Sequence, residues 1–183
     1  MPKDLAPWQV IESRISYEDR WLRLRTDTCK TAQGKIIESY HVVGALPWAN
    51  VVALNTEGKI ILVREYRHGA KKILLGLPGG AVESSDLNPL EAIQRELREV
   101  TGYSGGKFFQ IGQCYANPSN QNNIVYSFLA VGVVQGKKRL PMHKESASII
   151  PIALHLLICL GRQRGINNNR QQPRYVARQF HLL

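Results

Sequence analysis

Two carboxylates in the segment Arg95–Tyr103 are spaced so that they could bind a metal ion together. Glu96 and Glu99 are three residues apart, so on a helix they project from the same side. The preceding loop carries Gly79 and Gly80, and glycine lets backbone carbonyls approach a ligand closely. Carboxylates and a carbonyl are hard oxygen ligands, which suit Mg²⁺ or Mn²⁺ bridged to phosphates. The chemistry that this set of residues could support is attack of water on a diphosphate.

A second interpretation of the same acids involves no ligand. Acidic pairs on helices often form a solvated face, and Val100 stands where a third carboxylate would complete a cluster. At about 100° per residue, Val100 falls between Glu96 and the apolar side of the helix, so it can also be read as core. The residue types alone leave both interpretations open.

The residues around the two acids predict a well-bounded helix. Asn88 suits the N-cap, Pro89 suits the first helical position, and Glu91 follows three residues after the cap, as in a capping box. Gly102 suits a left-handed exit. The apolar residues that repeat at helical spacing are Leu90, Ile93 and Leu97. We therefore expect a helix between Asn88 and Gly102 with this stripe facing the core.

Short β-rich runs on both sides of the helix predict the strands that position it. They are Val10–Ile15, Trp21–Thr28, Ile36–Val43, Val51–Leu54, Lys59–Arg64, Phe108–Ile111 and Asn123–Val131. The first three suggest a small antiparallel sheet, and the next two are almost wholly apolar, as expected of strands buried on both faces. The segment between Arg64 and the helix is rich in glycine and proline and is expected to be a loop.

The segment Leu77–Tyr103 as a whole resembles the Nudix box, G-x5-E-x7-R-E-U-x-E-E-x-G-U with U apolar. The matching positions are Gly80, Arg95, Glu96, Leu97, Glu99, Gly102 and Tyr103. The resemblance covers residues 8–131, and Val63–Gly69 is similar to the strand and arginine that precede the box in the ADP-ribose pyrophosphatase-like branch. It implies an α/β fold, a Nudix-type α/β/α sandwich with a mixed sheet and an N-terminal antiparallel β-extension.

The resemblance also implies roles for the two acids and their neighbours. Glu96 and Glu99 match acids that bind divalent metal in the family, and one of them often serves as the catalytic base. Gly79 matches a position whose carbonyl is commonly a metal ligand. Arg95 matches an arginine that orients a box carboxylate, for which Glu83 is the first candidate; Asp86 is the alternative, because the loop is one residue longer than the pattern.

Substrate-binding residues are expected outside the box. Arg67 matches an arginine that contacts substrate phosphates in the branch, although an arginine that ends a strand can also be a plain surface residue. Trp48 could stack on a nucleobase or pack in the core. The region Ala116–Asn123, where the branch often supplies a further glutamate, contains no acid.

Three segments are expected along the chain. Residues 1–45 form the β-extension, which in the branch commonly supports a homodimer; residues 46–135 form the Nudix core; and residues 136–183 form a divergent tail. The tail holds 9 of the 24 lysines and arginines but a single acid, Glu145. Within it, Ser148–Gly161 is almost wholly apolar and is expected to form one buried helix. Because the charge of +10 is concentrated in this tail, the charge pattern does not indicate nucleic acid as a partner.

The composition favours a cytoplasmic protein. Its three cysteines are far apart, there is no signal-like N-terminus, and no run of residues is long and apolar enough to span a membrane.

The activity that the resemblance implies is Mg²⁺- or Mn²⁺-dependent hydrolysis of ADP-ribose or a nucleotide sugar to a nucleoside monophosphate and a phosphorylated product. The alternative is a catalytically impaired module that binds a nucleotide or a partner, because Val100 replaces a metal-binding glutamate.

Overall fold

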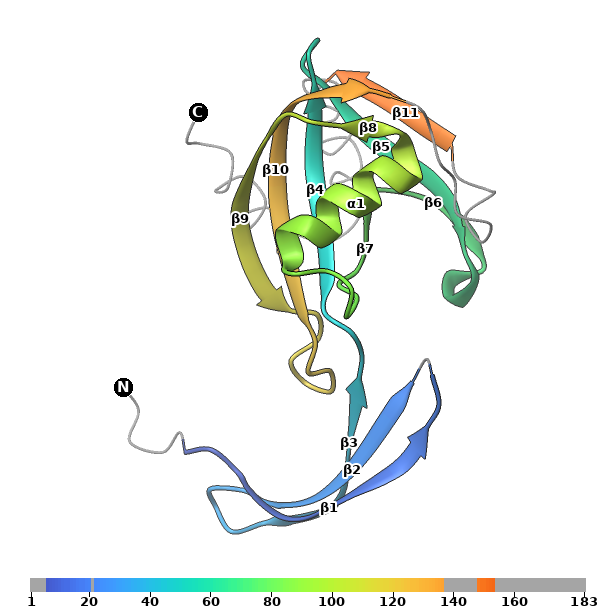
Figure 1. The fold of residues 1–183 in the computed structure, drawn as a ribbon. Coiled ribbons are helices and arrows are strands. Elements are labelled where there is room, and N and C mark those ends of the chain that lie inside the picture. Colours follow the sequence, from blue (N-terminus) through green and yellow to red (C-terminus); the bar gives the residue numbers. More distant parts are fainter. Residues whose placement is uncertain (1–5, 21, 137–147, 154–183) are drawn as a thin grey trace, which may run out of the picture.

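The computed structural model describes residues 6–20, 22–136 and 148–153, which form two β-sheets and, within these ranges, one α-helix (Figure 1). The smaller sheet contains β1 (Gln9–Glu18), β2 (Arg23–Lys30) and β3 (Ile36–Gly44) in that order, with antiparallel pairing throughout. Its three strands contain or overlap the three runs predicted from the sequence. The small sheet lies at one end of the larger sheet, and the chain passes directly from β3 into β4 (Figure 1).

The larger sheet is mixed. Its strands are β4 (Trp48–Asn55), β5 (Lys59–Arg67), β6 (Lys72–Gly76), β7 (Gly79–Ala81), β8 (Tyr103–Ser104), β9 (Lys107–Tyr115), β10 (Ile124–Gln135) and β11 (Ser148–Ala153). The central order is β11-β5-β4-β10-β8, with β6 beside β5, β7 beside β4 and β9 beside β10. The β4–β10 pair is parallel and the other pairs are antiparallel. The expected mixed α/β fold is therefore confirmed.

Two parts of the expected loop before the helix are strands. β6 and β7 are short and pair with β5 and β4, and a 3₁₀ turn (His68–Ala70) links β5 to β6. Lys71, which follows this turn, has a left-handed φ of 51°. Strands of three to five residues have too little internal pattern to be read from sequence, because their partners define them.

The predicted helix over Ser148–Gly161 is wrong for its first six residues. Ser148–Ala153 form β11, which pairs antiparallel with Lys59–Arg64 of β5; residues 154–161 lie outside the described part of the chain. The strand satisfies backbone groups along an edge of β5 that would otherwise lack partners. Three of its residues are isoleucines, which favour strands, and an edge strand tolerates Pro151 because its missing N–H costs no ladder bond when it faces outward.

The helix α1 (Pro89–Thr101) begins and ends where the sequence predicts. The Asn88 side chain accepts a hydrogen bond from the Glu91 N–H at 3.0 Å, and Glu91 Oε2 accepts one from the Leu87 N–H at 2.6 Å. At the other end Gly102 has φ 76°, and its N–H donates to the Arg98 carbonyl. The helix therefore starts at a side-chain cap and stops at a left-handed glycine, which fix its two ends.

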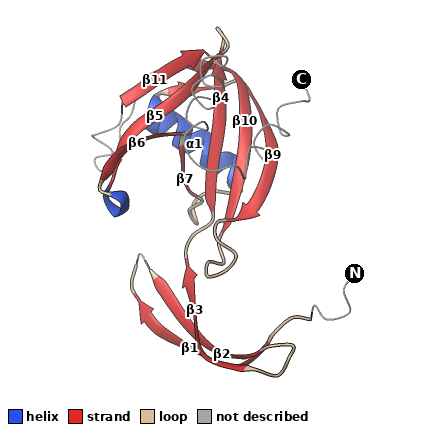
Figure 2. Ribbon diagram, turned by 180° about the vertical axis from the view of Figure 1, so that it is seen from behind, coloured by secondary structure: helices blue, strands red, loops and turns tan. Residues whose placement is uncertain are grey.

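The core lies between α1 and one face of the larger sheet (Figures 1 and 2). Ile93 and Leu97 are fully buried and pack with Ile61 of β5 and Phe128 of β10. Leu90, which the sequence assigns to the same stripe, lies in the first turn of the helix and is 38% exposed. Within the described ranges α1 is the one α-helical layer; a second layer, which the sandwich expectation includes, is not among those residues.

No helix in the described part of the chain is long and apolar enough to cross a membrane.

The burial of the helix stripe predicts unequal effects of two leucine truncations. Leu97→Ala should lower the free energy of unfolding by about 3 kcal/mol, because it leaves a cavity in the core. Leu90→Ala should cost less than about 1 kcal/mol, since its side chain is already partly solvated. Urea unfolding followed by circular dichroism measures both values; equal losses would contradict the described packing.

Candidate functional site

The two glycines before the helix lie where no side chain fits. β7 pairs with β4 so that Gly79 is opposite Asn50 and Gly80 is opposite Ala49. A Cβ atom on Gly79 would lie 2.6 Å from the Ala49 carbonyl oxygen, and one on Gly80 would lie 2.0 Å from the Glu96 carboxyl carbon. The Glu96 carboxyl group therefore lies directly against the Gly80 backbone, and the glycine is needed for this close approach.

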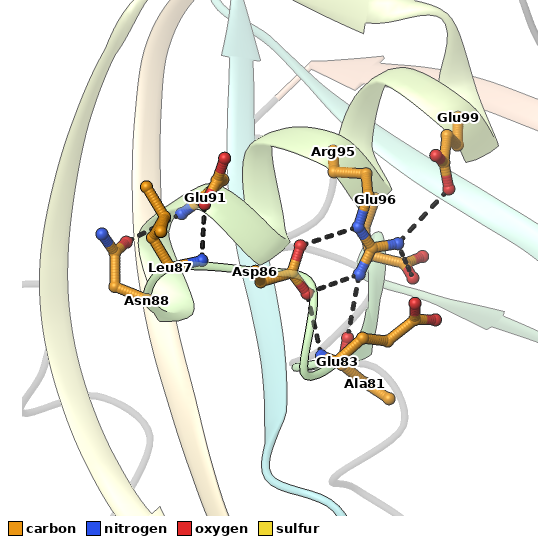
Figure 3. Close-up of polar contacts among 9 residues, drawn as sticks. All are labelled: Ala81, Glu83, Asp86, Leu87, Asn88, Glu91, Arg95, Glu96 and Glu99. Atoms are coloured by element: carbon orange, nitrogen blue, oxygen red, sulfur yellow. Dashed lines mark hydrogen bonds and ion pairs between the residues drawn. The ribbon is translucent and has the colours of Figure 1, made fainter.

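Glu96 is a buried carboxylate held in one place. The residue is 5% exposed, and Arg95 Nη1 donates a hydrogen bond to its Oε1 at 3.0 Å (Figure 3). The same Nη1 contacts Glu99 Oε2 at 3.4 Å, so one guanidinium nitrogen lies within reach of both acids. The Glu99 side chain is more open, at 32% exposed. The structure thus brings the two sequence-predicted acids to one side of α1, with Arg95 beside them.

Arg95 also ties the helix to the loop that precedes it. Its Nε and Nη2 donate to the two carboxylate oxygens of Asp86, each at 2.9 Å, and Nη2 donates to the Ala81 carbonyl at 3.2 Å (Figure 3). Asp86 Oδ2 accepts a further bond from the Glu83 N–H at 2.8 Å. Planar, bidentate pairs of this kind are among the strongest polar contacts in proteins.

The carboxylate that Arg95 orients is therefore Asp86, and the expectation that it is Glu83 is corrected. The Glu83 residue is exposed and contributes its backbone N–H, whereas the Asp86 side chain is 3% exposed. Asp86 lies six residues after Gly80, which is the spacing of the box acid; the extra residue of the loop follows it. The sequence left Asp86 as the alternative because it could not show on which side of the acid the insertion falls.

The pKa values of this ion pair reflect their mutual contact. The hydrogen bonds from Arg95 lower the pKa of Asp86 below its ordinary value, against the opposing effect of burial. The Asp86 carboxylate in turn raises the pKa of Arg95. Both groups are charged at neutral pH, so the loop and helix are joined by a fixed ion pair.

Trp48 lies beside the glycine loop. It is the first residue of β4, pairs with Ala81, and is partly buried. Its indole nitrogen is 3.1 Å from the point where a Cβ atom on Gly79 would lie. The strand pairing that brings Gly79 and Gly80 under the helix therefore also brings Trp48 to this loop.

Arg67 is at the end of β5, and its described ion-pair partner is Glu65. In a strand alternate side chains share a face. Ile61 packs with the helix stripe, and Val63 packs with Val100, so residues 65 and 67 continue the helix-facing row. The sequence did not single out Glu65; the alternation of β5 was the signal that could have found it.

Val100 belongs to the core, as the sequence suggested. It is 2% exposed and packs against Val63 of β5. The position where a third helix carboxylate would stand is thus filled by an apolar contact between the helix and the sheet.

The loop over Ala116–Asn123 is hydrogen-bonded to the small sheet. The Val43 N–H donates to the Asn120 carbonyl at 2.8 Å, and the Tyr40 hydroxyl donates to the Ser119 carbonyl. These bonds connect the small sheet to the turn between β9 and β10.

The oxygen donors of the site suit a hard divalent cation. Glu96, Glu99 and the Gly79 carbonyl are oxygen donors, and Mg²⁺ is commonly held by one or two carboxylates together with water and substrate phosphates. Among the described residues no group of three or more His, Cys, Asp or Glu side chains is placed to hold a metal ion. The residues present therefore fit an ion that shares its coordination with substrate, and they do not form a closed protein cage.

Comparisons with protein families agree with this geometry. A model described as "NUDIX domain" matches residues 46–162, which is more than half of the chain. A second model, described as "Nucleoside diphosphate sugar hydrolase N-terminal domain", matches residues 8–43 and so covers the small sheet.

Individual proteins are similar to part of the chain. The chain is 35% identical over 118 residues to an ADP-ribose pyrophosphatase of Bacillus subtilis (strain 168), a match that covers 63% of each protein. It is 29% identical over 124 residues to putative nudix hydrolase 2 of Caenorhabditis elegans, covering 62% of this chain and 55% of that one. The match thus spans less than two thirds of the length of these relatives.

A solved structure has the same fold. The crystal structure of an ADP compounds hydrolase superimposes with a TM-score of 0.74, over 91% of this chain and 89% of that chain, at 17% identity.

The Asp86–Arg95 pair predicts a defined dependence of stability on pH. Because the folded-state pKa of Asp86 is lowered, the stabilisation is complete above the unfolded pKa of about 4 and is lost as pH falls through the folded value. Asp86→Asn should lower the free energy of unfolding by about 3 kcal/mol at pH 7, because it leaves Arg95 without its main partner.

Urea unfolding of both proteins at pH 7 and pH 3 is the measurement. The difference between wild type and variant should shrink at pH 3. A difference that is equally large at both pH values would show that Asp86 does not stabilise the fold through its charge.

Proposed function

Because this chain belongs to the NUDIX domain family, we propose that it is a divalent-metal-dependent hydrolase that cleaves a nucleoside diphosphate linked to another moiety. ADP-ribose is the first candidate substrate, and a nucleotide sugar is the second. The products from ADP-ribose and one water are AMP and ribose 5-phosphate. The names of similar proteins and of the matched N-terminal model support this choice of substrate class.

The observation that carries the proposal is the position of Glu96. Its carboxylate is buried and ion-paired with Arg95, and it is held against a glycine backbone and beside a second acid. Burying a charged group is costly unless it is paired and hydrogen-bonded. A chain that needed only a stable helix would place an apolar residue here, so we infer that this carboxylate is retained for chemistry.

The residues then act as follows. Glu96 and Glu99, with the Gly79 carbonyl, would hold Mg²⁺ or Mn²⁺, and such an ion would offset phosphate charge and acidify water. Arg95 keeps the Glu96 carboxylate oriented toward the loop. Either Glu96 or Glu99 accepts the proton of the attacking water.

The rest of the substrate is held by residues outside the helix. Arg67 binds a phosphate through its guanidinium, which offers several donors in a fixed plane. Trp48 provides an aromatic surface beside Gly79 on which a nucleobase or ribose packs.

The described cysteines, Cys29 and Cys114, are free thiols, which supports a cytoplasmic location.

Loss of the Glu96 carboxylate should abolish turnover. With Mg²⁺ or Mn²⁺ present, the wild type should convert ADP-ribose to AMP, and Glu96→Gln should lower kcat by at least about 100-fold, because the metal loses a charged ligand. EDTA should stop the reaction. Phosphorus NMR or chromatography of the products measures this, with Glu57→Gln, an exposed acid on the β4–β5 turn, as the matched control.

A second candidate function is a catalytically impaired module that binds a nucleotide. The observations that favour it are the burial of Val100 against Val63 and the absence, among the described residues, of a three-acid group placed for metal. The same assay separates the two. An inactive wild type with a gain of activity in Val100→Glu would favour the binding module; turnover that depends on Glu96 would exclude it.

The small sheet supports a further part of the proposal, a homodimer. Every residue of β1 is exposed, and its large apolar side chains include Val10, Ile11, Ile15 and Tyr17. A three-stranded sheet with solvated apolar side chains gains stability when a partner covers it. We propose that a second copy of the chain does so.

The dimer is tested by sedimentation. The wild type should sediment at twice the mass of the 20.6 kDa chain, and Ile15→Asp should sediment as a monomer. Thr56→Asp, on an exposed turn of the core, is the control and should leave the dimer intact. A monomeric wild type across the accessible concentration range would contradict the proposal.

A further inference from the structure

One ion pair on β5 combines a mostly buried acid with an open arginine. The Glu65 side chain is 16% exposed, whereas that of its partner Arg67 is 47% exposed, and Arg67 Nη2 contacts Glu65 Oε1. Glu65 is the only acid between residues 58 and 82. The other charged residues of that stretch are basic: Lys59, Arg64, Arg67, Lys71 and Lys72.

The acid in this stretch calls for an explanation, because the basic β5–β6 hairpin would attract a phosphate more strongly without it. Removing a carboxylate from water is unfavourable unless it gains a partner of opposite charge. Glu65 has this partner in Arg67, and the ion pair restricts the rotational freedom of the arginine side chain.

Strand alternation assigns the pair to the helix side of the sheet. Ile61, two residues before Val63, packs with the inner stripe of α1, and Val63 packs with Val100. The alternation of the strand places Glu65 and Arg67 next in the same row. Val100 directly follows Glu99 in the helix, so the row leads from the core contact to the side of α1 where the acids lie.

We propose that Glu65 is a positioning residue that holds Arg67 ready for the phosphates of a nucleoside diphosphate substrate. This inference rests on the proposed function, since it assigns Arg67 to phosphate binding. Glu65 engages one terminal nitrogen, and the other donors of the guanidinium remain for the ligand. A long side chain that is already ordered loses less entropy when it binds, so preorganisation increases affinity.

A purely structural role for the pair has a matched comparison where the β4–β5 turn enters β5. Glu57 and Lys59 are also two residues apart and form an ion pair at the opposite end of β5, with side chains 64% and 46% exposed. Glu57→Ala removes the same type of contact at the other end of β5, and it is the control for charge and for hairpin stability.

The test is a double-mutant cycle on ADP-ribose binding. Isothermal titration calorimetry with EDTA present measures the Kd without turnover, for wild type, Glu65→Ala, Arg67→Ala, the double variant and Glu57→Ala. Glu65→Ala should weaken binding about tenfold, and Glu65→Gln, which keeps a neutral acceptor, should fall between it and the wild type. In the Arg67→Ala background Glu65→Ala should have no further effect.

Steady-state kinetics with metal adds a second readout. Glu65→Ala should raise KM for ADP-ribose about tenfold and leave kcat within about twofold, since the residue does not touch the reacting atoms. Thermal melts establish that each variant is folded; if the alanine variant is not, the glutamine variant carries the test.

Three results would overturn the inference: unchanged or tighter ADP-ribose binding by the Glu65 variants, equal weakening with and without Arg67, or no ADP-ribose binding by the wild type. Failure of the proposed activity is a different result, in which the wild type binds ADP-ribose but does not hydrolyse it. The cycle of dissociation constants can still be read in that case.

Discussion

The arrangement of the site depends on the guanidinium of Arg95. It binds both oxygens of Asp86, the Ala81 carbonyl and the carboxylate of Glu96, so one side chain connects the loop, strand β7 and the helix. This contact lowers the pKa of Asp86, which also accepts a backbone bond that closes the loop. Without the pair, the loop would lose its link to α1, and a buried carboxylate would lose the donor that offsets its charge.

The second constraint is the close approach of backbone to carboxylate. Gly80 leaves room for Glu96 that any larger residue would fill, and the β4–β7 pairing fixes the glycines in that place. The same helix presents Ile93 and Leu97 to the core, so core packing and the orientation of the acids are set by one register. Val100 makes another apolar contact between the helix and the sheet, so the site has one carboxylate fewer than it would have with a glutamate at this position.

Much of this could be predicted from the sequence because the signals are local. The cap at Asn88, the exit at Gly102 and the shared side of the two acids follow from helical geometry and short-range hydrogen bonds. The predictions that failed concern residues whose structural partners are distant in sequence. β7 is a strand only because β4 lies beside it, and β11 reads as an apolar helix until the open edge of β5 is known. The choice of Asp86 over Glu83 and the Glu65–Arg67 pair likewise could not be predicted, since each depends on which side chains meet in the folded chain.

The central claim is that Glu96 forms the core of a metal site although no third acid stands beside it on the helix. Titration with Mn²⁺, followed by electron paramagnetic resonance of the free ion, tests this without any substrate turnover. The wild type should bind Mn²⁺ saturably, and Glu96→Gln should weaken that binding at least tenfold while Glu57→Gln leaves it unchanged, because only Glu96 is held against the glycine loop. Equal Mn²⁺ affinity in the wild type and Glu96→Gln would contradict the account.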